Sequence, residues 1–297
     1  MKVFVSGSSS HLARALLPRL CAHPAVTGIT GLDLMPPVYA HAKFRALQGD
    51  LRSTPLVQLL AGHNALIHLA WVVLRGRTSV ANMHAVNIEA SLALFRAAHA
   101  AGVTRFIHLS SAAVYGAGMQ LTETAPLAPE GDFLYAQHKA ELERLLAAEF
   151  PERVVLRPHI ILGPHAQPLL LTLARQPFYP ALPDPQPLLQ CVHEDDVSQA
   201  ILLCLEQRRS GTYNLASTDS FSFREVVRKN KIHCALPLPL IEVLTMLAWR
   251  LTGWGGEPGW VTAMDKTLTL DCSKARRELG WQPRYSARET LNRLFHR

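Results

Sequence analysis

Three polar residues of this 297-residue chain have the types and the spacing of a proton-transfer site. Tyr135 and Lys139 lie four positions apart in "YAQHK", so a helix places both side chains on one face. Tyrosine is a poor base at neutral pH, but a nearby ammonium group stabilises the phenolate and lowers its pKa. Ser111 closes the apolar run "TRFIHLSS", where its hydroxyl can hold the substrate oxygen that Tyr135 protonates or deprotonates. We therefore take Ser111, Tyr135 and Lys139 as the candidate catalytic residues.

Apolar runs alternate with stretches of helical period along the first half of the chain. Strand-like runs cover 2–7, 28–34, 65–70, 104–111 and 153–162, and helical periods cover 12–20, 87–102 and 135–150. This alternation predicts right-handed βαβ units and a parallel sheet. We expect an α/β fold with a Rossmann-type doubly wound parallel sheet over residues 1–163. A smaller, proline-rich substrate lobe is expected over 164–297, with segments around 191–216 returning to the Rossmann core.

The turn after the first strand, "VSGSSSHLA", stands where such a sheet carries a glycine-rich phosphate-binding loop. Gly7 is its only glycine, and Ser10 and Ala13 occupy the second and third positions of a GxxGxxG spacing. By itself the turn is weak support, because serine-rich turns that cap a helix are common. Backbone N–H groups at a helix start nevertheless bind anions whatever their side chains. The residues expected to contact the phosphates are Gly7, Ser9, Ser10, His11 and Leu12.

Asp33 ends the second apolar run, at the offset expected for the acidic residue that binds the ribose hydroxyls of a dinucleotide. A carboxylate there accepts hydrogen bonds from free hydroxyls and repels a 2′-phosphate. No arginine occupies the turn or directly follows Asp33, which favours NAD over NADP. The alternative is that Asp33 only ends a strand, but turn, offset and residue type together indicate a cofactor site.

Composition and charge limit the remaining classes of protein. Hydrophobic residues make up 48% and charged residues 18%, as in a globular protein. The net charge of +7 is dispersed, without a basic stretch interleaved with aromatic residues, so we expect no nucleic-acid partner. Five scattered cysteines without a CxxC motif favour a reducing compartment and argue against structural zinc. No residues with convincing metal-ligand spacing stand out, and no metal is expected.

No segment predicts insertion into a membrane. The chain begins "MKVFV", an apolar strand without the features of a signal peptide. The longest apolar run lies near "LPLPLIEVLTMLAW"; it is interrupted by Pro237, Pro239 and Glu242 and is too short to cross a bilayer. We expect a cytoplasmic protein that acts on a small-molecule substrate and has no membrane partner.

Taken together, the motifs resemble those of the extended short-chain dehydrogenases/reductases, the NAD-dependent epimerase/dehydratase family. The resemblance covers most of the chain and implies a Rossmann-type fold and NAD as cofactor. It is carried by "VSGSSSHLA", "GLDL", "GDL", "LIHLAW", "VNIEAS", "LSSAAVYG", "YAQHK", "LRPHIILGP", "CVHEDDVSQAI", "GTYNLAS" and "DCSKARRELGWQP". The first of these segments departs from the family's loop at two of its three glycines.

The resemblance implies a role for each matching residue. Tyr135 would be the general acid/base, Lys139 would bind the nicotinamide ribose and tune Tyr135, and Ser111 would orient the substrate. Trp71 and His159, which follow strand ends beside the expected nicotinamide, are further substrate candidates. Additional cofactor contacts are implied for Asp50 and Leu51 at the adenine, and for Leu69, Ala70, Asn87 and Pro158.

Two positions depart from the family's sugar-nucleotide enzymes at the substrate end. Ile160 stands where those enzymes often have asparagine, and Leu189 stands where an arginine often clamps the diphosphate. Losing a bidentate phosphate contact weakens the nucleotide-sugar interpretation. The basic residues that could replace it are Arg157, Arg175 and Lys266.

We expect an NAD-dependent oxidoreductase of the epimerase/dehydratase type, acting on a hydroxyl or keto carbon of a sugar, nucleotide sugar or related substrate. The sequence leaves open whether it is an epimerase, a dehydratase or a dehydrogenase. One alternative is a hydroxysteroid- or ketone-type dehydrogenase with an apolar substrate, because the late segments are rich in proline and leucine. Another is a non-catalytic NAD-sensing regulatory protein, although such proteins usually lack the Tyr–Lys pair.

Two predicted helices suggest how the chain assembles. In the resembling family the equivalent helices pair across a two-fold axis, which implies a homodimer with an isologous interface. Segments 87–101 and 135–149 carry apolar residues on more than one face, namely Leu92, Leu94, Phe95, Leu142, Leu145 and Leu146.

Overall fold

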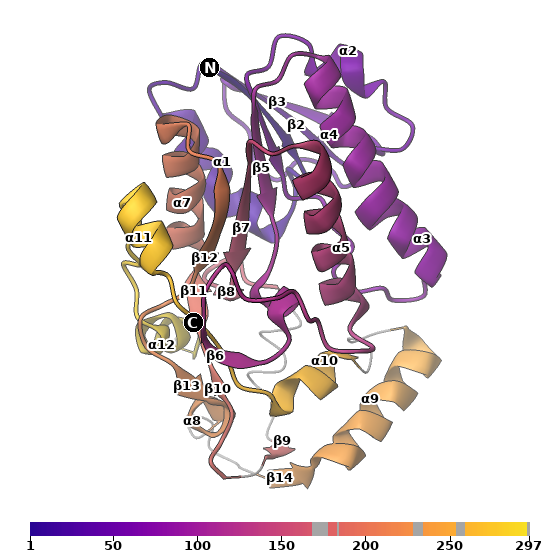
Figure 1. The fold of residues 1–297 in the computed structure, drawn as a ribbon. Coiled ribbons are helices and arrows are strands. Elements are labelled where there is room, and N and C mark those ends of the chain that lie inside the picture. Colours follow the sequence, from indigo (N-terminus) through magenta and orange to yellow (C-terminus); the bar gives the residue numbers. More distant parts are fainter. Residues whose placement is uncertain (168–177, 183, 228–233, 254–258, 296–297) are drawn as a thin grey trace.

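A parallel sheet of seven strands forms the centre of the fold (Figure 1). The computed structural model describes residues 1–167, 178–182, 184–227, 234–253 and 259–295. The strand order β12-β7-β5-β4-β1-β2-β3 reverses direction between β1 and β4, as in a doubly wound sheet. The expected Rossmann-type fold is thereby confirmed. The strands are β1 (Lys2–Ser6), β2 (Gly28–Asp33), β3 (Phe44–Gln48), β4 (Ala65–His68), β5 (Arg105–Leu109), β7 (Arg153–Pro158) and β12 (Gly211–Leu215).

Helices cover both faces of the sheet (Figure 1). One face carries α1 (His11–Ala22), α7 (Glu194–Gln207) and α11 (Ser273–Leu279). The other carries α2 (Leu56–Leu60), α3 (Val80–His84), α4 (Ser91–Ala100) and α5 (Leu134–Glu149). Every residue of β4 is buried, because strands covered on both faces need apolar side chains on both sides.

The predicted helix over 87–102 is the later part of a longer helical segment. Helix α3, a π-helical segment η1 (Ala85–Ala90) and α4 follow one another without a break. Gly102, with a φ of +81°, lies just beyond the last turn, where glycine tolerates the left-handed conformation. π-helical segments often occur at functional positions, and this one contains Asn87.

The later part of the chain forms short strand pairs and helices below the sheet (Figure 1). The pairs are β6 (Gly118–Leu121) with β15 (Leu268–Leu270), β8 (Ile160–Leu162) with β11 (Cys191–His193), β9 (Phe178–Ala181) with β14 (Cys234–Pro237), and β10 (Leu188–Leu189) with β13 (Phe221–Ser222). The helices are η2 (Ala112–Tyr115), α8 (Phe223–Val227), α9 (Leu238–Thr252), α10 (Gly259–Thr262), η3 (Ala263–Asp265) and α12 (Ala287–Phe295). Among the described residues, no helix is long and apolar enough to cross a membrane.

The run predicted as one strand over 153–162 is divided at His159. Strand β7 stays in the large sheet, whereas β8 leaves it and pairs in parallel with β11. The chain then returns through α7, which packs on α1, and through β12, which pairs with β7 at the edge of the sheet. Late segments therefore complete both the sheet and one of its covering layers.

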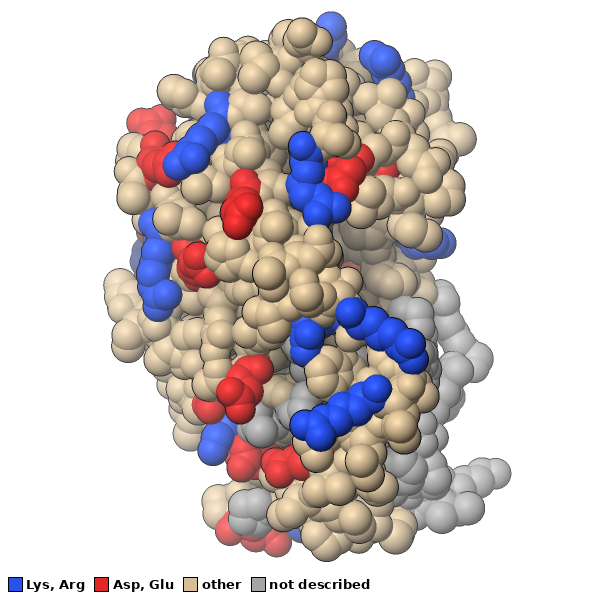
Figure 2. All heavy atoms as spheres, turned by 90° about the vertical axis from the view of Figure 1, so that its right-hand side faces the viewer, with Lys and Arg blue, Asp and Glu red and all other residues tan. Residues whose placement is uncertain are grey.

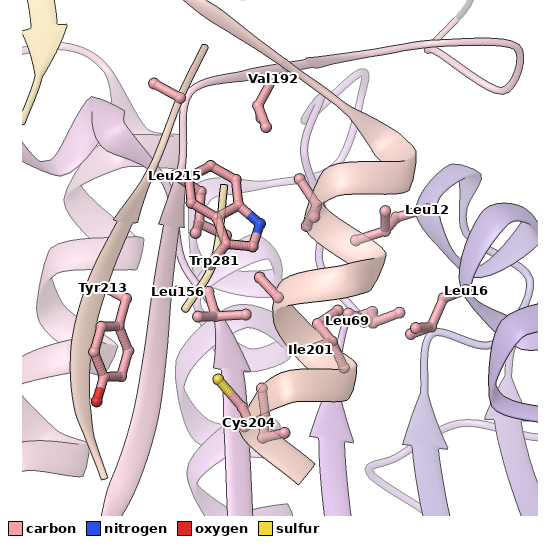
Figure 3. Close-up of a cluster of buried hydrophobic side chains, with 14 of the residues drawn as sticks. Leu12, Leu16, Leu69, Leu156, Val192, Ile201, Cys204, Tyr213, Leu215 and Trp281 are labelled. Atoms are coloured by element: carbon pink, nitrogen blue, oxygen red, sulfur yellow. The ribbon is translucent and has the colours of Figure 1, made fainter. Parts of the chain in front are cut away.

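Apolar side chains from distant segments meet between the sheet and the helices α1 and α7 (Figure 3). Leu12 and Leu16 come from α1, and Ile201 comes from α7. Trp281, which follows α11, is fully buried in the same cluster, and its Nε1 donates to the Asp196 carbonyl at 2.8 Å. The C-terminal region is thus fastened to the Rossmann core by a large aromatic side chain.

Charges are mixed on the surface that the helices α3, α4 and α5 share with α9 (Figure 2). Lysine and arginine side chains are interspersed with aspartate and glutamate, and no large area of a single sign forms on this face. The basic residues are therefore dispersed on this surface, as they are along the sequence.

A buried ion pair fixes α5 on the sheet. Arg157 of β7 reaches Glu143 of α5, with Nη2 at 2.5 Å from Oε2 and Nε at 3.1 Å from both carboxylate oxygens. Arg157 Nη1 also donates to the Tyr115 hydroxyl at 2.6 Å, and that hydroxyl donates to Asn214 of β12 at 2.8 Å. The Ser110 hydroxyl donates to the same carboxylate. One charge pair therefore joins α5, η2, β7, β12 and the end of β5.

We expect Arg157→Leu to lower the free energy of unfolding by about 3–5 kcal/mol, because it leaves the Glu143 carboxylate buried without its cation. The matched control is Arg96→Leu, which removes the ion pair of Arg96 with Glu149 on exposed surface. That pair is screened by solvent, so the control should unfold at nearly the wild-type urea concentration. Equal midpoints for the two variants in urea titrations would contradict this account of the buried pair.

Candidate active site

Residues from five neighbouring strands meet at one edge of the sheet. Parallel strands end at the same edge, and a doubly wound sheet opens there where its strand order reverses. The residues that directly follow or close β1, β2, β4, β5 and β7 at this edge include Gly7, Asp33, Ala70, Ser111 and Pro158. All of them were predicted from the sequence as cofactor or catalytic residues, and the fold brings them to one edge of the sheet, where a doubly wound sheet binds its ligand.

Gly7 shapes the first turn. Its φ is +75°, and its N–H donates to the Leu32 carbonyl at 2.9 Å. A Cβ added here would lie 2.4 Å from the Ala70 nitrogen and 2.7 Å from the Leu69 carbonyl carbon. The turn after β1 therefore packs directly on the turn after β4, and no side chain fits between them. This close approach is the reason that the first glycine of the spacing is retained.

Ser10 takes the place of the second glycine as a helix cap. Its Oγ accepts the Ala13 N–H at 3.4 Å, and its own N–H donates to the Gly7 carbonyl at 3.0 Å. The first-turn N–H groups of His11 and Leu12 have no partner within the helix, because no turn precedes them. The Leu12 side chain is buried in the core, so this residue can offer only its backbone to a phosphate.

Asp33 stands at the end of β2 beside this turn. Its two carboxylate oxygens accept the Ser9 N–H at 2.8 Å and the Met35 N–H at 2.9 Å. Each oxygen keeps a lone pair for a ribose hydroxyl, because an ionised carboxylate accepts about four hydrogen bonds. The N–H of Ser9 is used for this contact, so Ser9 positions Asp33 rather than offering its amide to a phosphate.

Asp50 and Leu51, the residues expected at the adenine, follow β3. Arg52 donates to the Asp50 carboxylate from Nη2 at 2.6 Å and from Nε at 3.1 Å, and these bonds lower the pKa of Asp50. Arg52 Nη1 also donates to Asn82 at 2.9 Å. Leu51 is partly buried and packs against an apolar cluster that contains Leu56 and Leu60 of α2. The Asp50 side chain is thus held by Arg52, whose planar guanidinium is a feature that the sequence analysis overlooked.

Asn87 supports the turn after β4 from the π-helical segment. Its Oδ1 accepts the Val72 N–H at 2.8 Å, and its Nδ2 donates to the Val72 carbonyl at 3.1 Å. Asn87 is fully buried, and both ends of its amide are occupied by these backbone groups. The structure therefore gives its amide a supporting role for the backbone at residue 72, and a cofactor contact of Asn87 stays a prediction from the resemblance.

The three candidate catalytic residues lie together. Ser111 caps η2, where its Oγ accepts the Ala113 N–H at 3.2 Å, and its hydroxyl is close enough to Tyr135 to influence the pKa of the phenol. Burial raises the pKa of Tyr135, and the Ser111 hydroxyl lowers it. Lys139 Nζ lies 6.0 Å from the centre of the Tyr135 ring. Seryl hydroxyl, phenol and amine are thus grouped as acid–base chemistry at a carbinol requires.

Lys139 is enclosed by the turn that follows β4. Its Nζ donates to the Leu109 carbonyl at 2.6 Å and lies 3.6 Å from the centre of the Trp71 ring. Burial holds the pKa of Lys139 well below the usual lysine range, and the Glu143 carboxylate opposes this effect. The amine is therefore able to change its protonation state closer to neutral pH than an exposed lysine can.

Trp260 of the late lobe contacts Tyr135, a contact that the sequence did not predict. Its ring lies 5.4 Å from the Tyr135 ring and 4.7 Å from the Phe133 ring, measured between centroids. In the described part of the chain, the buried Nε1 atoms of Trp260 and Trp71 have no hydrogen-bond partner. Two enclosed indole N–H groups near the Tyr–Lys pair are thus unpaired among the residues that the structure describes. No local motif marks position 260, so the sequence held no signal for it.

His159 is built into the fold rather than the crevice. Its Nδ1 accepts the Ile160 N–H at 2.8 Å, and its Nε2 donates to the Leu268 carbonyl at 2.9 Å. The residue is buried, which lowers its pKa to about 4, so the ring stays neutral at physiological pH. Both nitrogens are occupied by the protein, which leaves no polar atom of this ring for a substrate.

Two of the basic residues considered as phosphate ligands are held in ion pairs. Arg157 is buried in its pair with Glu143, and Lys266 lies 3.5 Å from the Asp265 carboxylate. Arg175 lies outside the described residues. Leu189, at the position of the family's arginine, is buried in β10. The "HEDD" segment starts α7, with His193 as its N-cap, and the described residues contain no cluster of metal-ligating side chains.

The fold and the site together define a dinucleotide-dependent oxidoreductase. The family model for the NAD-dependent epimerase/dehydratase family matches residues 3–216, and the chain belongs to that family. Its cofactor is NAD, and the crevice suits this group. The Gly7 turn leaves room for backbone to approach phosphates, and the Asp33 carboxylate lies at the ribose position.

Two relatives that are named for different reactions, a ketoreductase and an epimerase, have similar sequence identity to this chain. It is 29% identical to the 4-hydroxy-2-methyl-3-oxo-4-farnesyl-3,4-dihydroquinoline-1-oxide ketoreductase of Stigmatella aurantiaca, over 99% of this chain and 96% of that protein. It is 26% identical to the UDP-glucose 4-epimerase of Corynebacterium glutamicum, over 98% and 93%.

Solved structures share the fold along nearly the whole chain. DesIV, the dTDP-glucose 4,6-dehydratase from Streptomyces venezuelae solved with NAD and TYD bound, superposes with a TM-score of 0.76 at 25% identity. The match covers 99% of this chain and 95% of that one. MoeE5 in complex with UDP-glucuronic acid and NAD also gives 0.76, at 22% identity and with coverage of 98% and 97%.

We expect Gly7→Ala to abolish measurable NAD binding and to lower the free energy of unfolding by roughly 2–5 kcal/mol, because the new Cβ must displace the turn after β4. The control is Gly62→Ala. Gly62 has a similar φ of +76° but open space around the added Cβ. It should cost about 1–2 kcal/mol and leave NAD binding intact. Calorimetric NAD titrations and thermal unfolding measure both effects, and equal losses in the two variants would refute the close-approach argument.

Proposed function

We propose that the protein oxidises a secondary carbinol of a sugar-type substrate with NAD. The observation that carries this proposal is the placement of Tyr135 and buried Lys139 on one side of α5, with Nζ 6.0 Å from the phenol ring, at the sheet edge where Ser111 follows β5. A non-catalytic NAD-sensing protein would have no need of this arrangement. The 26% identical UDP-glucose 4-epimerase and the fold shared with dTDP-glucose 4,6-dehydratase support a sugar or nucleotide sugar as substrate.

The residues act in one proton-transfer step. Tyr135 accepts the proton of the substrate hydroxyl while the Ser111 hydroxyl holds the same oxygen. NAD, when bound, supplies the acceptor for the hydride that leaves the carbinol carbon. Lys139 in its ammonium form, with Nζ close to the phenol ring, stabilises the phenolate, and it donates a hydrogen bond to the Leu109 carbonyl. This oxidation is common to dehydrogenases, epimerases and dehydratases, which differ in what then happens to the ketone.

An apolar alcohol or ketone is the second candidate substrate. Leu189 is buried where the family's sugar-nucleotide enzymes often carry a phosphate-binding arginine, and Arg157 is paired with Glu143. The aromatic rings of Phe133 and Trp260 stand beside Tyr135 instead. The Stigmatella ketoreductase is named for a farnesyl quinoline substrate, and a 24% identical relative from Mycolicibacterium neoaurum is a 3-beta-hydroxysteroid dehydrogenase.

We further propose that residues 1–163 form the NAD-binding domain and that 164–297 mostly supply the substrate lobe. The position of Trp260 against Tyr135 supports the second part of this division. The five cysteines are all free, which supports the reducing cytoplasm as the compartment.

We expect Tyr135→Phe to reduce turnover by about 10²- to 10⁴-fold with NAD affinity unchanged, because it removes only the acid–base hydroxyl. Ser111→Ala should cost less, and Lys139→Met should weaken both turnover and NAD binding. Since burial raises the pKa of Tyr135, wild-type oxidation should accelerate as pH rises through that pKa. The assay is NADH formation with sugars, sugar acids, nucleotide sugars and sterols.

Tyr213→Phe is the matched control, since its hydroxyl contacts Ser210 and Glu278 away from the crevice. It should keep wild-type turnover. Near-wild-type turnover of Tyr135→Phe, with normal NAD binding, would show that a different group is the base.

We propose a homodimer built on the outer surfaces of α4 and α5. The six apolar residues first taken to indicate it do not form a free surface, because all but the half-buried Leu145 are buried in this chain's own core. Four of the eight exposed residues of the two helices are small, namely Ala93, Ala100, Ala147 and Ala148, and would allow close helix packing. Light scattering should give twice the monomer mass of 32.8 kDa; a monomer at micromolar concentration contradicts the proposal.

A further inference from the structure

Helix α9 is the part of the late lobe that the proposed site leaves unexplained. It spans Leu238–Thr252, and none of its residues is buried. Successive residues of a helix are 100° apart, which places positions 240, 243, 244, 247 and 251 on a single stripe. Each of these side chains is 44–74% exposed: Leu240, Val243, Leu244, Leu247 and Leu251. The stripe is a continuous row of large, exposed aliphatic residues. Helix α9 itself lies at the margin of the molecule (Figure 1).

The opposite side of α9 is fastened to the protein. Trp249 Nε1 donates to the Gly76 carbonyl at 3.1 Å, and the Arg75 guanidinium lies 4.6 Å from the centre of the Trp249 ring. Arg77 Nη2 donates to the Leu251 carbonyl at 3.0 Å at the end of the helix. These contacts fix which side of the helix faces outward. The aliphatic stripe is therefore a stable feature of the surface.

Charge distinguishes between the possible occupants of this stripe. Arg250 lies on exposed surface within α9, and Arg77 lies at its end, so cations border the aliphatic row. Glu242 is the only carboxylate of the helix, and its position is turned away from the stripe. Aliphatic residues bordered by arginines match a surface of acyl chains beneath anionic headgroups.

A second copy of this chain fits the stripe less well. The five side chains expose on the order of 500 Å² of surface, whereas a stable interface takes about 800 Å² from each partner. Each copy would also bring its own arginines to this contact and a net charge of +7, and these like charges repel each other. We propose that α9 docks the protein on an anionic phospholipid surface, with the aliphatic stripe among the acyl chains and Arg77 and Arg250 at the phosphates.

This docking differs from membrane insertion. The expectation of no membrane partner rested on the lack of a run long enough to span a bilayer, whereas a helix that lies in the interface needs only one apolar side. Helix α9 packs on α10, whose Trp260 contacts Tyr135, so the docking helix and the catalytic tyrosine are one element apart. The inference holds for either proposed substrate class, because it depends on the helix surface alone.

The test is co-sedimentation of the full-length protein with vesicles of phosphatidylcholine alone or with about a third phosphatidylglycerol. Wild-type protein should bind the anionic vesicles, and binding should weaken in about 1 M salt, which screens the arginines. The double variant Leu244→Gln, Leu247→Gln should bind at least tenfold more weakly, because glutamine keeps helix propensity but removes the apolar contact. Arg250→Gln should lose about fivefold on anionic vesicles only.

The control variant is Val57→Gln with Met119→Gln, two apolar residues of similar exposure on other surfaces, which should bind vesicles like wild type. Circular dichroism and NAD titration check that each variant folds, separately from any activity. If the α9 variant misfolds, the test uses wild-type protein alone: backbone amide hydrogen exchange of residues 238–252 should become slower when anionic vesicles are added. The proposal is overturned if wild-type protein ignores anionic vesicles or if the α9 variant binds undiminished. A dimer that the α9 variant dissociates would assign the stripe to a second copy.

Discussion

The buried pair of Glu143 and Arg157 is the interaction on which the arrangement of this site depends. The two charges are enclosed between α5 and β7, where neither is stable without the other. Their remaining hydrogen-bonding capacity is used by Ser110, by Tyr115 and, through that hydroxyl, by Asn214. Segments far apart in the chain are therefore held in one arrangement by a network whose members are all buried. A network of this kind specifies position more strongly than apolar packing alone, because each polar atom must meet its partner.

The same pair sets the geometry of the proton-transfer residues. Glu143 lies one turn beyond Lys139 and two turns beyond Tyr135 on the same side of α5, so fixing Glu143 fixes the rotation of the helix. The Glu143 carboxylate also accepts a hydrogen bond from the Ser110 hydroxyl. This bond fixes the position of Ser110, which directly precedes Ser111. The Glu143 charge also raises the pKa of the buried lysine against the effect of burial. One ion pair thus serves both the positions and the protonation states of the site.

The late lobe completes this arrangement and adds a surface of its own. The His159 ring connects β7 to β15 through the Leu268 carbonyl, and Trp249 connects α9 to the turn at Gly76. Trp260 then lies on the catalytic tyrosine. Helix α9 cannot rotate its aliphatic stripe into the core, because the opposite side of the helix is already bound to the protein through Trp249. The lobe that encloses the site is therefore also the part that presents aliphatic residues to its surroundings.

The sequence by itself determined the features that depend on local spacing. Helical period places Tyr135 and Lys139 on one face, and the strand–turn–helix pattern around Gly7 predicts the doubly wound sheet and its crevice. Only the tertiary structure decided which polar groups remain free there. Asn87 is used by backbone, Arg157 by Glu143, and Trp260 arrives from a segment without any motif. The reason is physical: local geometry follows from dihedral preferences and periodicity, whereas the partner of a buried polar group is chosen among residues distant in sequence.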